Sequence, residues 1–162
     1  MTKLIIRRFL ASEKKQIKDF YELASVHSEI GYRSGPWEAD FEDIDRVYVD
    51  TGGDFLVGII DEKIVAMVGL LRKSDHIAHI RRMRVHPDYR RKGNAGEILR
   101  KIEEIAKENG VKELQLKTST QQKMAQNFYE KNGYVKLEKE KEYYTEGGGN
   151  AFEVVWYRKI LE

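Results

Sequence analysis

The stretch VHPDYRRKGNAG, residues 85–96, decides the fold because it separates a strand pattern from a helix pattern. Ile77 to Val85 before it has the apolar character of a β-strand, and Asn94 to Asn109 after it repeats apolar residues at helical spacing up to Gly110. A further strand pattern begins at Leu114. A strand-helix-strand crossover of this length predicts two neighbouring parallel strands.

The turn between this strand and helix has the residue types of an anion-binding site. The first N–H groups of a helix have no partner inside it, and its N-terminus carries partial positive charge. Gly93 and Gly96 allow the backbone to bend or to approach a ligand closely. Six of the twelve residues from Arg81 to Lys92 are basic. From these residues alone, a solvated basic turn is an equally good interpretation, and neither nucleotide-binding glycine pattern is present.

The strand that precedes the turn has an irregular apolar pattern. Ala78 and Ile80 share one parity, whereas Met83 and Val85 share the other. A regular strand cannot direct all four side chains to one face. An extra residue near positions 81–82, a β-bulge, would restore the register. The pattern therefore predicts a bulge, a feature that is frequent beside active sites.

The other elements follow from the same periodicities, and two prolines in predicted loops do not divide the chain. Further strands are predicted at 3–9, 55–60, 63–71, 114–118, 134–140 and 151–161, and further helices at 13–27, 40–49 and from Ser119 or Thr120 to Gly133. The predicted fold class is α/β, of the α+β kind. It has a mixed, mostly antiparallel sheet of six to seven strands, a central parallel pair and about four flanking helices. One domain is expected to span 1–162.

Composition excludes several classes of protein. The 162 residues include no cysteine, which removes thiolate nucleophiles, iron-sulfur clusters and Cys-type zinc sites, and we expect no metal. The apolar run from Ile64 to Leu71 is far too short to span a bilayer, and no signal-peptide pattern is present, so a cytoplasmic protein without a membrane partner is expected. A net charge of +2 gives no general reason to expect nucleic acid, and binding through the basic cluster at 81–92 is a minor alternative.

Two segments make the sequence similar to a known family. Residues 85–96 resemble the acetyl-CoA-binding signature of the GNAT N-acetyltransferases, (Q/R)-x-x-G-x-(G/A), with Arg90, Gly93 and Ala95 at its fixed positions. Residues 127–134, NFYEKNGY, resemble the second motif of the family, with Ala125 in register. The predicted element order is also that of the family. The resemblance implies a GNAT-like fold and transfer of an acetyl group from acetyl-CoA to a primary amine.

The resemblance implies a set of cofactor contacts. Backbone amides of the glycine turn would hold the pyrophosphate of CoA, and main-chain groups of the bulged strand would pair with the pantetheine arm. Gln122 stands where the family usually has asparagine, which is a departure from the second motif. The residues expected to bind acetyl-CoA are Met83, Arg84, Val85, Arg90, Arg91, Lys92, Gly93, Asn94, Ala95, Gly96 and Asn127.

The expected chemistry is direct attack of a neutral amine on the thioester, through a tetrahedral intermediate, because no cysteine is available as a nucleophile. By resemblance, Tyr129 is the acid that protonates the leaving thiolate. His79 stands where many relatives have a glutamate and is the candidate base. Because that glutamate is absent, a non-catalytic acyl-CoA-binding sensor or regulatory domain is the alternative.

The acceptor is expected to be a small-molecule amine or a peptide amine. Residues 38–50 contain six acids and one base, an acidic segment that could attract a cationic amine or simply be a solvated helix face. Loops expected near the mouth of the acceptor pocket contain four aromatic residues, which could form cation-π contacts with the amine or serve as packing residues: Tyr32, Trp37, Tyr143 and Tyr144.

A homodimer is also possible, because a late strand, Val154 to Ile160, could pair with its copy in a second chain.

Overall fold

A computed structural model describes the chain except for residues 1–2, 30–31, 33–34 and 145–151. Its main sheet has the strand order β1-β2-β3-β4-β5-β8-β6, and the short β7 pairs with β8 alone. All neighbours are antiparallel except β4 and β5, which are parallel as the crossover predicts. The strands are β1 Ile5–Arg8, β2 Asp54–Ile60, β3 Lys63–Arg72, β4 Ile77–Val85, β5 Glu113–Ser119, β6 Val135–Leu137, β7 Tyr143–Tyr144 and β8 Phe152–Ile160.

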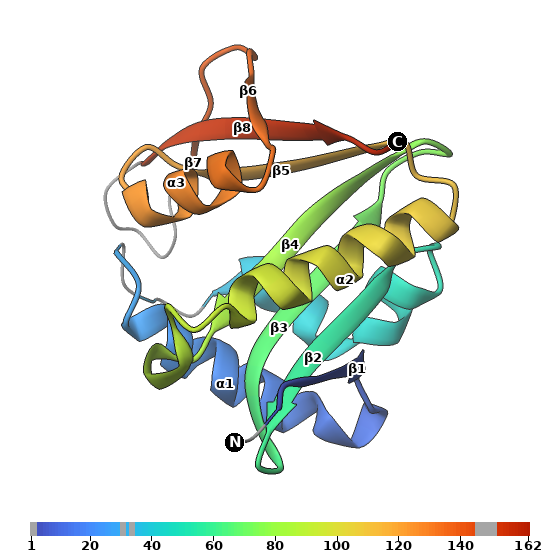
Figure 1. The fold of residues 1–162 in the computed structure, drawn as a ribbon, viewed down its shortest axis with the longest axis vertical. Helices are drawn as coiled ribbons and strands as arrows, with labels where there is room; N and C mark the ends of the chain where they lie inside the picture. Colours follow the sequence, from blue (N-terminus) through green and yellow to red (C-terminus); the bar gives the residue numbers. More distant parts are fainter. Residues whose placement is uncertain (1–2, 30–31, 33–34, 145–151) are drawn as a thin grey trace.

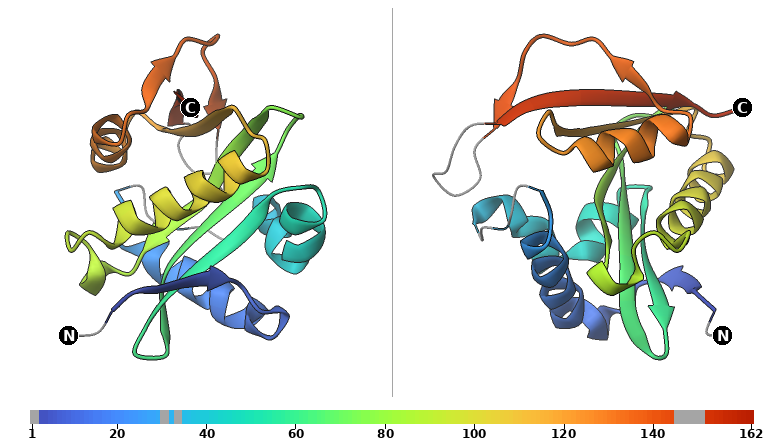
Figure 2. Two further views of the ribbon diagram at one scale, coloured as in Figure 1. Left: turned by 45° about the vertical axis from the view of Figure 1, so that its right-hand side comes forward. Right: turned by 60° about the vertical axis from the view of Figure 1, so that its left-hand side comes forward.

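Helices cover both faces of the sheet, α2 on one side and α1 with the short helical segments on the other (Figures 1 and 2). Each α-helix is amphipathic and buries one stripe, which is the reason for the 3.6-residue spacing of its apolar residues. The helical segments are η1 Ala11–Glu13, α1 Lys14–Val26, η2 Pro36–Glu42, η3 Asp45–Val49, η4 Pro87–Tyr89, α2 Asn94–Glu108 and α3 Lys123–Lys131. The predicted mixed sheet with its flanking helices is confirmed.

The central strands are apolar at nearly every position because both of their faces are covered. Leu56 and Val68 point into the core beneath α2. Phe55, Val57 and Met67 point into a second core beneath α1 and η3. The sheet is thus the middle layer between two apolar cores.

The predicted β-bulge is confirmed in β4. Gly69 of β3 pairs with Arg81, but Met67 pairs with Arg84, so Val68 alone lies opposite two residues. Arg82 takes a left-handed backbone conformation with φ of +57° at this point. The bulge adds one residue to β4 and bends the strand away from the regular ladder.

The parallel strands β4 and β5 are paired over only three residues. Ile77–His79 of β4 pair with Glu113–Gln115, and both strands then continue without pairing to each other. Figure 1 shows the two strands diverging toward α3. Beyond its short contact with β4, β5 is held by β8 along its other edge, from Glu113 to Ser119. The strand pairing is therefore interrupted between β4 and β5, in the middle of the sheet.

The structure differs from the sequence prediction in several connections. The predicted helix at 40–49 is divided into a 3-10 segment, Pro36–Glu42, and a π-helical segment, Asp45–Val49. Tertiary contacts explain the division, because Asp40 and Tyr48 are both buried and the Tyr48 hydroxyl donates to Asp40 at 2.6 Å. The strand predicted at 134–140 covers only Val135–Leu137, and β7 was not predicted. The glycines at 147–149 lie outside the described residues.

The expectation that Val154 to Ile160 could pair across a dimer is wrong. This segment is part of β8, which has β5 on one side and β6 and β7 on the other. Its hydrogen-bonding groups are thus largely used inside the sheet, and the edge strands of the main sheet are β1 and β6. In the part of the chain that the structure describes, no helix has the length and apolar character needed to cross a bilayer.

Candidate active site

The gap between the diverging strands contains a cleft of about 370 Å³. It is bounded by β4 and β5, by α1 and η2 on one side and by α3 and β8 on the other. The described residues that line it include no aspartate or glutamate. The lining residues are Tyr21, Trp37, His79, Ile80, Arg81, Arg82, Met83, Arg84, Leu116, Lys117, Thr118, Gln122, Ala125, Tyr129 and Trp156.

The glycine turn, residues 90–96, leads from the end of β4 into α2, and its last backbone N–H groups form no hydrogen bond inside the helix. Arg91 and Gly93 have positive φ angles of +60° and +85°, which direct the chain sharply into the helix. The first N–H that bonds inside the helix is that of Glu97, to the Gly93 carbonyl, so residues 94–96 present theirs outward. A Cβ placed on Gly93 would meet no atom within 4 Å. The turn is therefore open and suited to an anionic group.

Arg90, a fixed position of the first motif, braces this turn rather than pointing its charge outward. Its guanidinium donates to three main-chain carbonyls, those of Val85 at 3.1 Å, His27 at 3.0 Å and Ala24 at 3.1 Å. Burial, together with the nearby Arg84, lowers the pKa of Arg90. The side chain ties the end of β4 to the end of α1, and the amides that follow it face the solvent.

Tyr129 of α3 presents its phenol to the cleft from within the core. The side chain is 8% exposed and packs edge-on against Phe128 and Tyr134. Its hydroxyl makes no hydrogen bond with any described residue, although it lines the cleft. Burial raises the pKa of Tyr129 to about 12, an effect that the charge of Arg84 partly opposes. The phenol is protonated at neutral pH and is available as a donor.

His79 also lines the cleft, on β4, with its ring 5.2 Å from that of Trp156. Burial lowers the pKa of His79 to about 4, helped by the charges of Lys73 and Lys139, while a hydrogen bond with Gln115 acts in the opposite direction. The imidazole is therefore neutral at pH 7. Such a group accepts a hydrogen bond readily but holds a transferred proton poorly.

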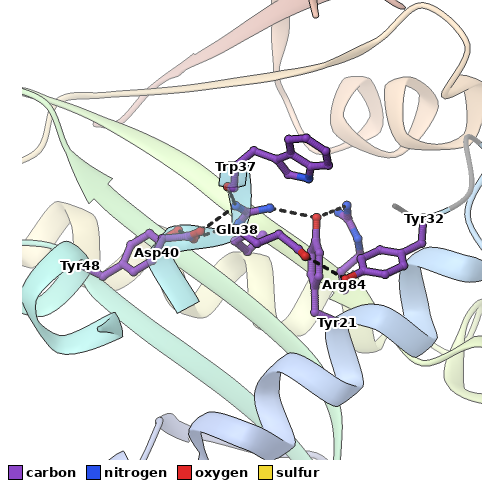
Figure 3. Close-up of polar contacts among 8 residues, drawn as sticks. Tyr21, Tyr32, Trp37, Glu38, Asp40, Tyr48 and Arg84 are labelled. Carbon is purple, nitrogen blue, oxygen red and sulfur yellow. Dashed lines mark hydrogen bonds and ion pairs between the residues drawn. The ribbon is translucent and has the colours of Figure 1, made fainter. Parts of the chain in front are cut away.

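Only Glu38 and Asp40 of the acidic segment at 38–50 are buried, whereas Glu42, Asp43, Asp45 and Asp50 are exposed. Asp40 binds Arg82 through two hydrogen bonds of 2.7 and 2.9 Å (Figure 3). Burial acts to raise the pKa of Asp40, but Arg82 outweighs it and the pKa lies below its usual range. Glu38 is also buried and accepts hydrogen bonds from Tyr32. The segment thus binds β4 to the helical loop, and among the described residues its carboxylates do not line the cleft.

The structure brings most of the predicted site together at one place. His79, Met83, Arg84 and Tyr129 line the cleft, and Val85 and residues 90–96 follow directly at the end of β4. Asn127 does not join them, because it is exposed on α3 and does not line the cleft. No group of three or more potential metal ligands occurs among the described side chains.

The aromatic residues expected at the mouth have different positions. Trp37 lines the cleft. Tyr32 instead bonds Glu38 beside it, and Tyr143 is 58% exposed on β7 and is not a lining residue. Gln122, the departure from the second motif, lines the cleft while its carbonyl oxygen accepts from Thr118 at 2.8 Å.

Sequence reasoning missed several lining groups, among them Arg81, Arg82, Lys117 and Trp156. Arg82 was seen only as the position of the bulge. Parity on the predicted strand does not single out Lys117, since Leu116 and Thr118, of the other parity, line the cleft as well. Trp156 reaches the cleft because β8 lies beside β5, a neighbour relation across the sequence that no local pattern reveals.

Comparisons with known proteins agree with this geometry. Residues 17–134 match the model of the acetyltransferase (GNAT) family. N-acetyltransferase 8 of Homo sapiens is 30% identical over 127 residues, which cover 75% of this chain and 51% of that protein. The chain therefore spans about half the length of this curated relative.

Solved structures share the fold. A GNAT-family acetyltransferase from Staphylococcus aureus superposes with a TM-score of 0.86 at 22% identity, covering 99% of this chain and 100% of the other. The PaiA N-acetyltransferase of Thermoplasma acidophilum, solved in complex with coenzyme A, has a TM-score of 0.76 at 19% identity, with coverage of 98% and 99%. With the family match across most of its length, the opened sheet and the glycine turn, the chain belongs to the GNAT family of acetyltransferases.

Proposed function

We propose that the chain is an N-acetyltransferase that moves the acetyl group of acetyl-CoA to a primary amine by direct attack, through a tetrahedral intermediate. The observation that carries this proposal is the Tyr129 phenol, which is protonated, has no partner among the described residues and faces the cleft. N-acetyltransferase 8, a relative by sequence, is named for the same class of reaction.

The residues present fit acetyl-CoA at two places. The open amides of residues 94–96 and the positive φ of Gly93 suit the pyrophosphate, and the T. acidophilum neighbour was solved with coenzyme A. On the edge that faces β5, β4 pairs with no strand beyond His79, and this edge suits the amide groups of the pantetheine arm. The carbonyls of Met83 and Val85 already accept hydrogen bonds from Arg84 and Arg90. Acetyl-CoA supplies the acetyl group as an activated thioester.

Tyr129 is the proposed acid for the sulfur. A phenol with a pKa of about 12 stays protonated at neutral pH, and it can donate to a thiolate as negative charge develops on the leaving sulfur. The low polarity of its surroundings strengthens that hydrogen bond, because few other dipoles compete for it.

The proposed role of His79 is to orient the amine. A general base works best when its pKa lies near the working pH, and a pKa of about 4 is far below it. The neutral imidazole can accept a hydrogen bond from the attacking nitrogen, while water in the cleft carries the proton away. His79 then serves the reaction without becoming a stable cation.

An acyl-CoA sensor is the second candidate, and one observation favours it. None of the described residues that line the cleft is a carboxylate, and the one histidine there is a weak base. A protein that binds acetyl-CoA without efficient turnover would have the same glycine turn. The two candidates differ in turnover, not in binding.

Thermal unfolding with acetyl-CoA, free CoA and ATP, followed by an amine panel, tests the proposal. Selective binding to the folded state raises the unfolding midpoint. We expect a rise with both CoA compounds, little change with ATP, and release of CoA when an accepted amine is added. Binding without turnover on a broad panel would favour the sensor, and no shift at millimolar ligand would reject both candidates.

A further inference from the structure

The bulge in β4 gathers arginines on one face of the sheet. In a regular strand, residues 81 and 83 would share one face and residues 82 and 84 the other. The extra residue changes this, because Met83 joins Ile80 on the face that packs into the core beneath α2. Arg81 then shares the opposite face with Arg82 and Arg84, which both reach the Tyr21 hydroxyl of α1. Arg81 lies over Gly69, opposite it on β3, and all three arginines line the cleft.

Only one of these three charges is neutralised by a carboxylate within the described structure. Arg82 forms its ion pair with Asp40 at 2.7 Å, and both side chains are almost fully buried. Figure 3 shows Arg84 beside Tyr21; its guanidinium donates to that hydroxyl, to the Ser25 hydroxyl and to the Met83 carbonyl, but to no described carboxylate. The guanidinium of Arg81 makes neither a hydrogen bond nor an ion pair with a described residue.

Other charges near the cleft offset Arg81 and Arg84 only in part, since the charge of Arg81 also helps to lower the pKa of Asp40. Lys117 adds a further cation, paired at 3.3 Å with Glu142 at the half-exposed rim. Glu38 is buried and accepts hydrogen bonds from the neutral Tyr32 hydroxyl, which does not cancel the charge of a carboxylate, but Glu38 does not line the cleft. His79 is neutral at pH 7. The described residues that line the cleft thus include four cationic side chains, those of Arg81, Arg82, Arg84 and Lys117, and no carboxylate, so the lining itself is positively charged.

Acetyl-CoA would not neutralise this charge in the proposed binding mode. Its phosphates belong at the glycine turn after Val85, beyond the end of β4, and its pantetheine arm and thioester are uncharged. The acceptor is the remaining component. A purely cationic amine would be repelled by two unpaired arginines, whereas an amine with an attached anion would be attracted.

We infer that the acceptor carries an anionic group beside its amine, held by Arg81 and Arg84, with the carboxylate of an α-amino acid as the simplest form. This inference rests on the proposed acetyltransferase function and names its substrate class. Guanidinium and carboxylate match geometrically and form strong charge-assisted hydrogen bonds. The two cations also favour the neutral form of the nearby amine, which reduces the demand for a strong base.

Matched acceptors test the inference directly. Each L-α-amino acid is compared with its amide and its decarboxylated amine, in saturating acetyl-CoA. We expect kcat/KM for the amino acids to exceed that for both counterparts at least tenfold in the best series. An aminoalkylphosphonate accepted in place of the carboxylate would equally support an anion site. Equal rates throughout, or a preference for diamines, would overturn the inference.

The variant Arg81→Gln assigns the effect to this residue. Because Arg81 has no bond to lose among the described residues, the variant should fold normally, and its preference for the amino acid should fall at least tenfold with the KM for acetyl-CoA changed less than twofold. Arg46→Gln, on exposed η3, is the matched control and should leave the preference unchanged. An unchanged preference in Arg81→Gln would remove this residue from the site.

A binding measurement separates this inference from the proposed function. Calorimetric titration of the preferred amino acid into protein saturated with CoA should give heat that Arg81→Gln abolishes. If acetyl-CoA binds but no amine is acetylated, the titration still decides: specific amino-acid binding supports the anion site, and its absence overturns it. Failure of acetyl-CoA itself to bind would instead reject the proposed function.

Discussion

At the scale of single residues, removing the Tyr129 hydroxyl tests its role in catalysis separately from any role in binding acetyl-CoA. Tyr129→Phe keeps the ring between Phe128 and Tyr134 and removes only an oxygen that bonds no described residue. We expect turnover to fall about 10²- to 10³-fold, in the range of an acid-base group, while the Kd for acetyl-CoA and the unfolding midpoint stay nearly constant.

Steady-state kinetics and calorimetry on the same preparations measure these quantities. Tyr143→Phe, at an exposed position on β7, is the control for the substitution itself. Turnover of Tyr129→Phe close to that of the parent protein would remove the assigned role. Because the pKa of Tyr129 is about 12, its ionisation should cause no loss of rate below pH 10.

His79 gives a prediction for stability against pH. Its pKa is about 4 in the folded protein and near 6.5 in the unfolded chain, so below pH 6.5 the unfolded chain binds a proton that the folded protein rejects. Stability is thus complete above pH 6.5 and is lost as the pH falls toward 4. After discounting for its partial exposure, we expect a loss of about 1 to 2 kcal/mol.

Urea unfolding at several pH values checks this loss. His79→Gln should flatten the curve between pH 6.5 and 4, whereas His76→Gln, at an exposed position before β4, should not. Identical curves for parent and His79→Gln would show that the imidazole titrates normally. Below about pH 4, protonation of carboxylates such as Glu13 and Asp40, whose pKa values are lowered, destabilises all variants alike.

At the scale of elements, the two ends of α2 offer a matched pair of glycines. Gly93 before the helix and Gly110 after it have φ angles of +85° and +83°. Alanine at either position should cost about 1 kcal/mol of stability, because a side chain disfavours this backbone conformation. Only Gly93→Ala also places a methyl group at the proposed phosphate site.

We therefore expect Gly93→Ala to weaken acetyl-CoA binding at least tenfold and Gly110→Ala to change it less than twofold. Calorimetry gives the two affinities, and urea unfolding confirms that the costs in stability are similar. Equal effects on binding would mean that the glycine turn acts only through the general stability of α2.

Elements with strong periodicity were predictable, and those formed by tertiary contacts were not. The bulge could be placed because four apolar side chains in Ala78 to Val85 had to reach one core. The segment 40–49 was predicted as one helix from its local pattern, but Asp40 and Tyr48 bond each other and Arg82, and this network divides it. A local pattern contains no information about partners forty residues away.

In the site, too, some features could be predicted from the sequence, and those that depend on tertiary contacts could not. The glycine turn and Tyr129 were predicted from their resemblance to the two family motifs, and Tyr129 lines the cleft. The charge of the cleft could not be predicted, because Asp40 is paired inside the protein and no described carboxylate of the acidic run at 38–50 lines the cleft, whereas Arg81 and Arg84 of β4 face it without a described carboxylate. Composition gives the charges of a segment but not which of them are already neutralised.

At the scale of the whole molecule, acetyl-CoA should connect two parts that share little sheet. The three residue pairs between β4 and β5 are the only main-sheet link between β1–β4 and β5–β8 in the described chain. A ligand lying between these strands should slow amide hydrogen exchange in both, at residues 80–85 and 116–119, and at the start of α3. Free CoA should give most of the effect.

Exchange followed by mass spectrometry, with and without ligand, measures this coupling. The outer strands β1 and β2 are the internal reference, because they lie on the far side of the sheet (Figure 2). Protection confined to the glycine turn, without any change in β5 or α3, would show that the ligand does not occupy the opened sheet.

The short β4–β5 contact also determines how the protein responds to mechanical force. The N-terminal strand β1 and the C-terminal strand β8 belong to different sides of this contact, so tension between the two termini acts across three paired residues and the core beneath them (Figure 1). A ligand bound to both strands carries part of that tension. Under the proposed binding of acetyl-CoA, an unfoldase that pulls across this contact would then meet a resistance that rises with the concentration of acetyl-CoA.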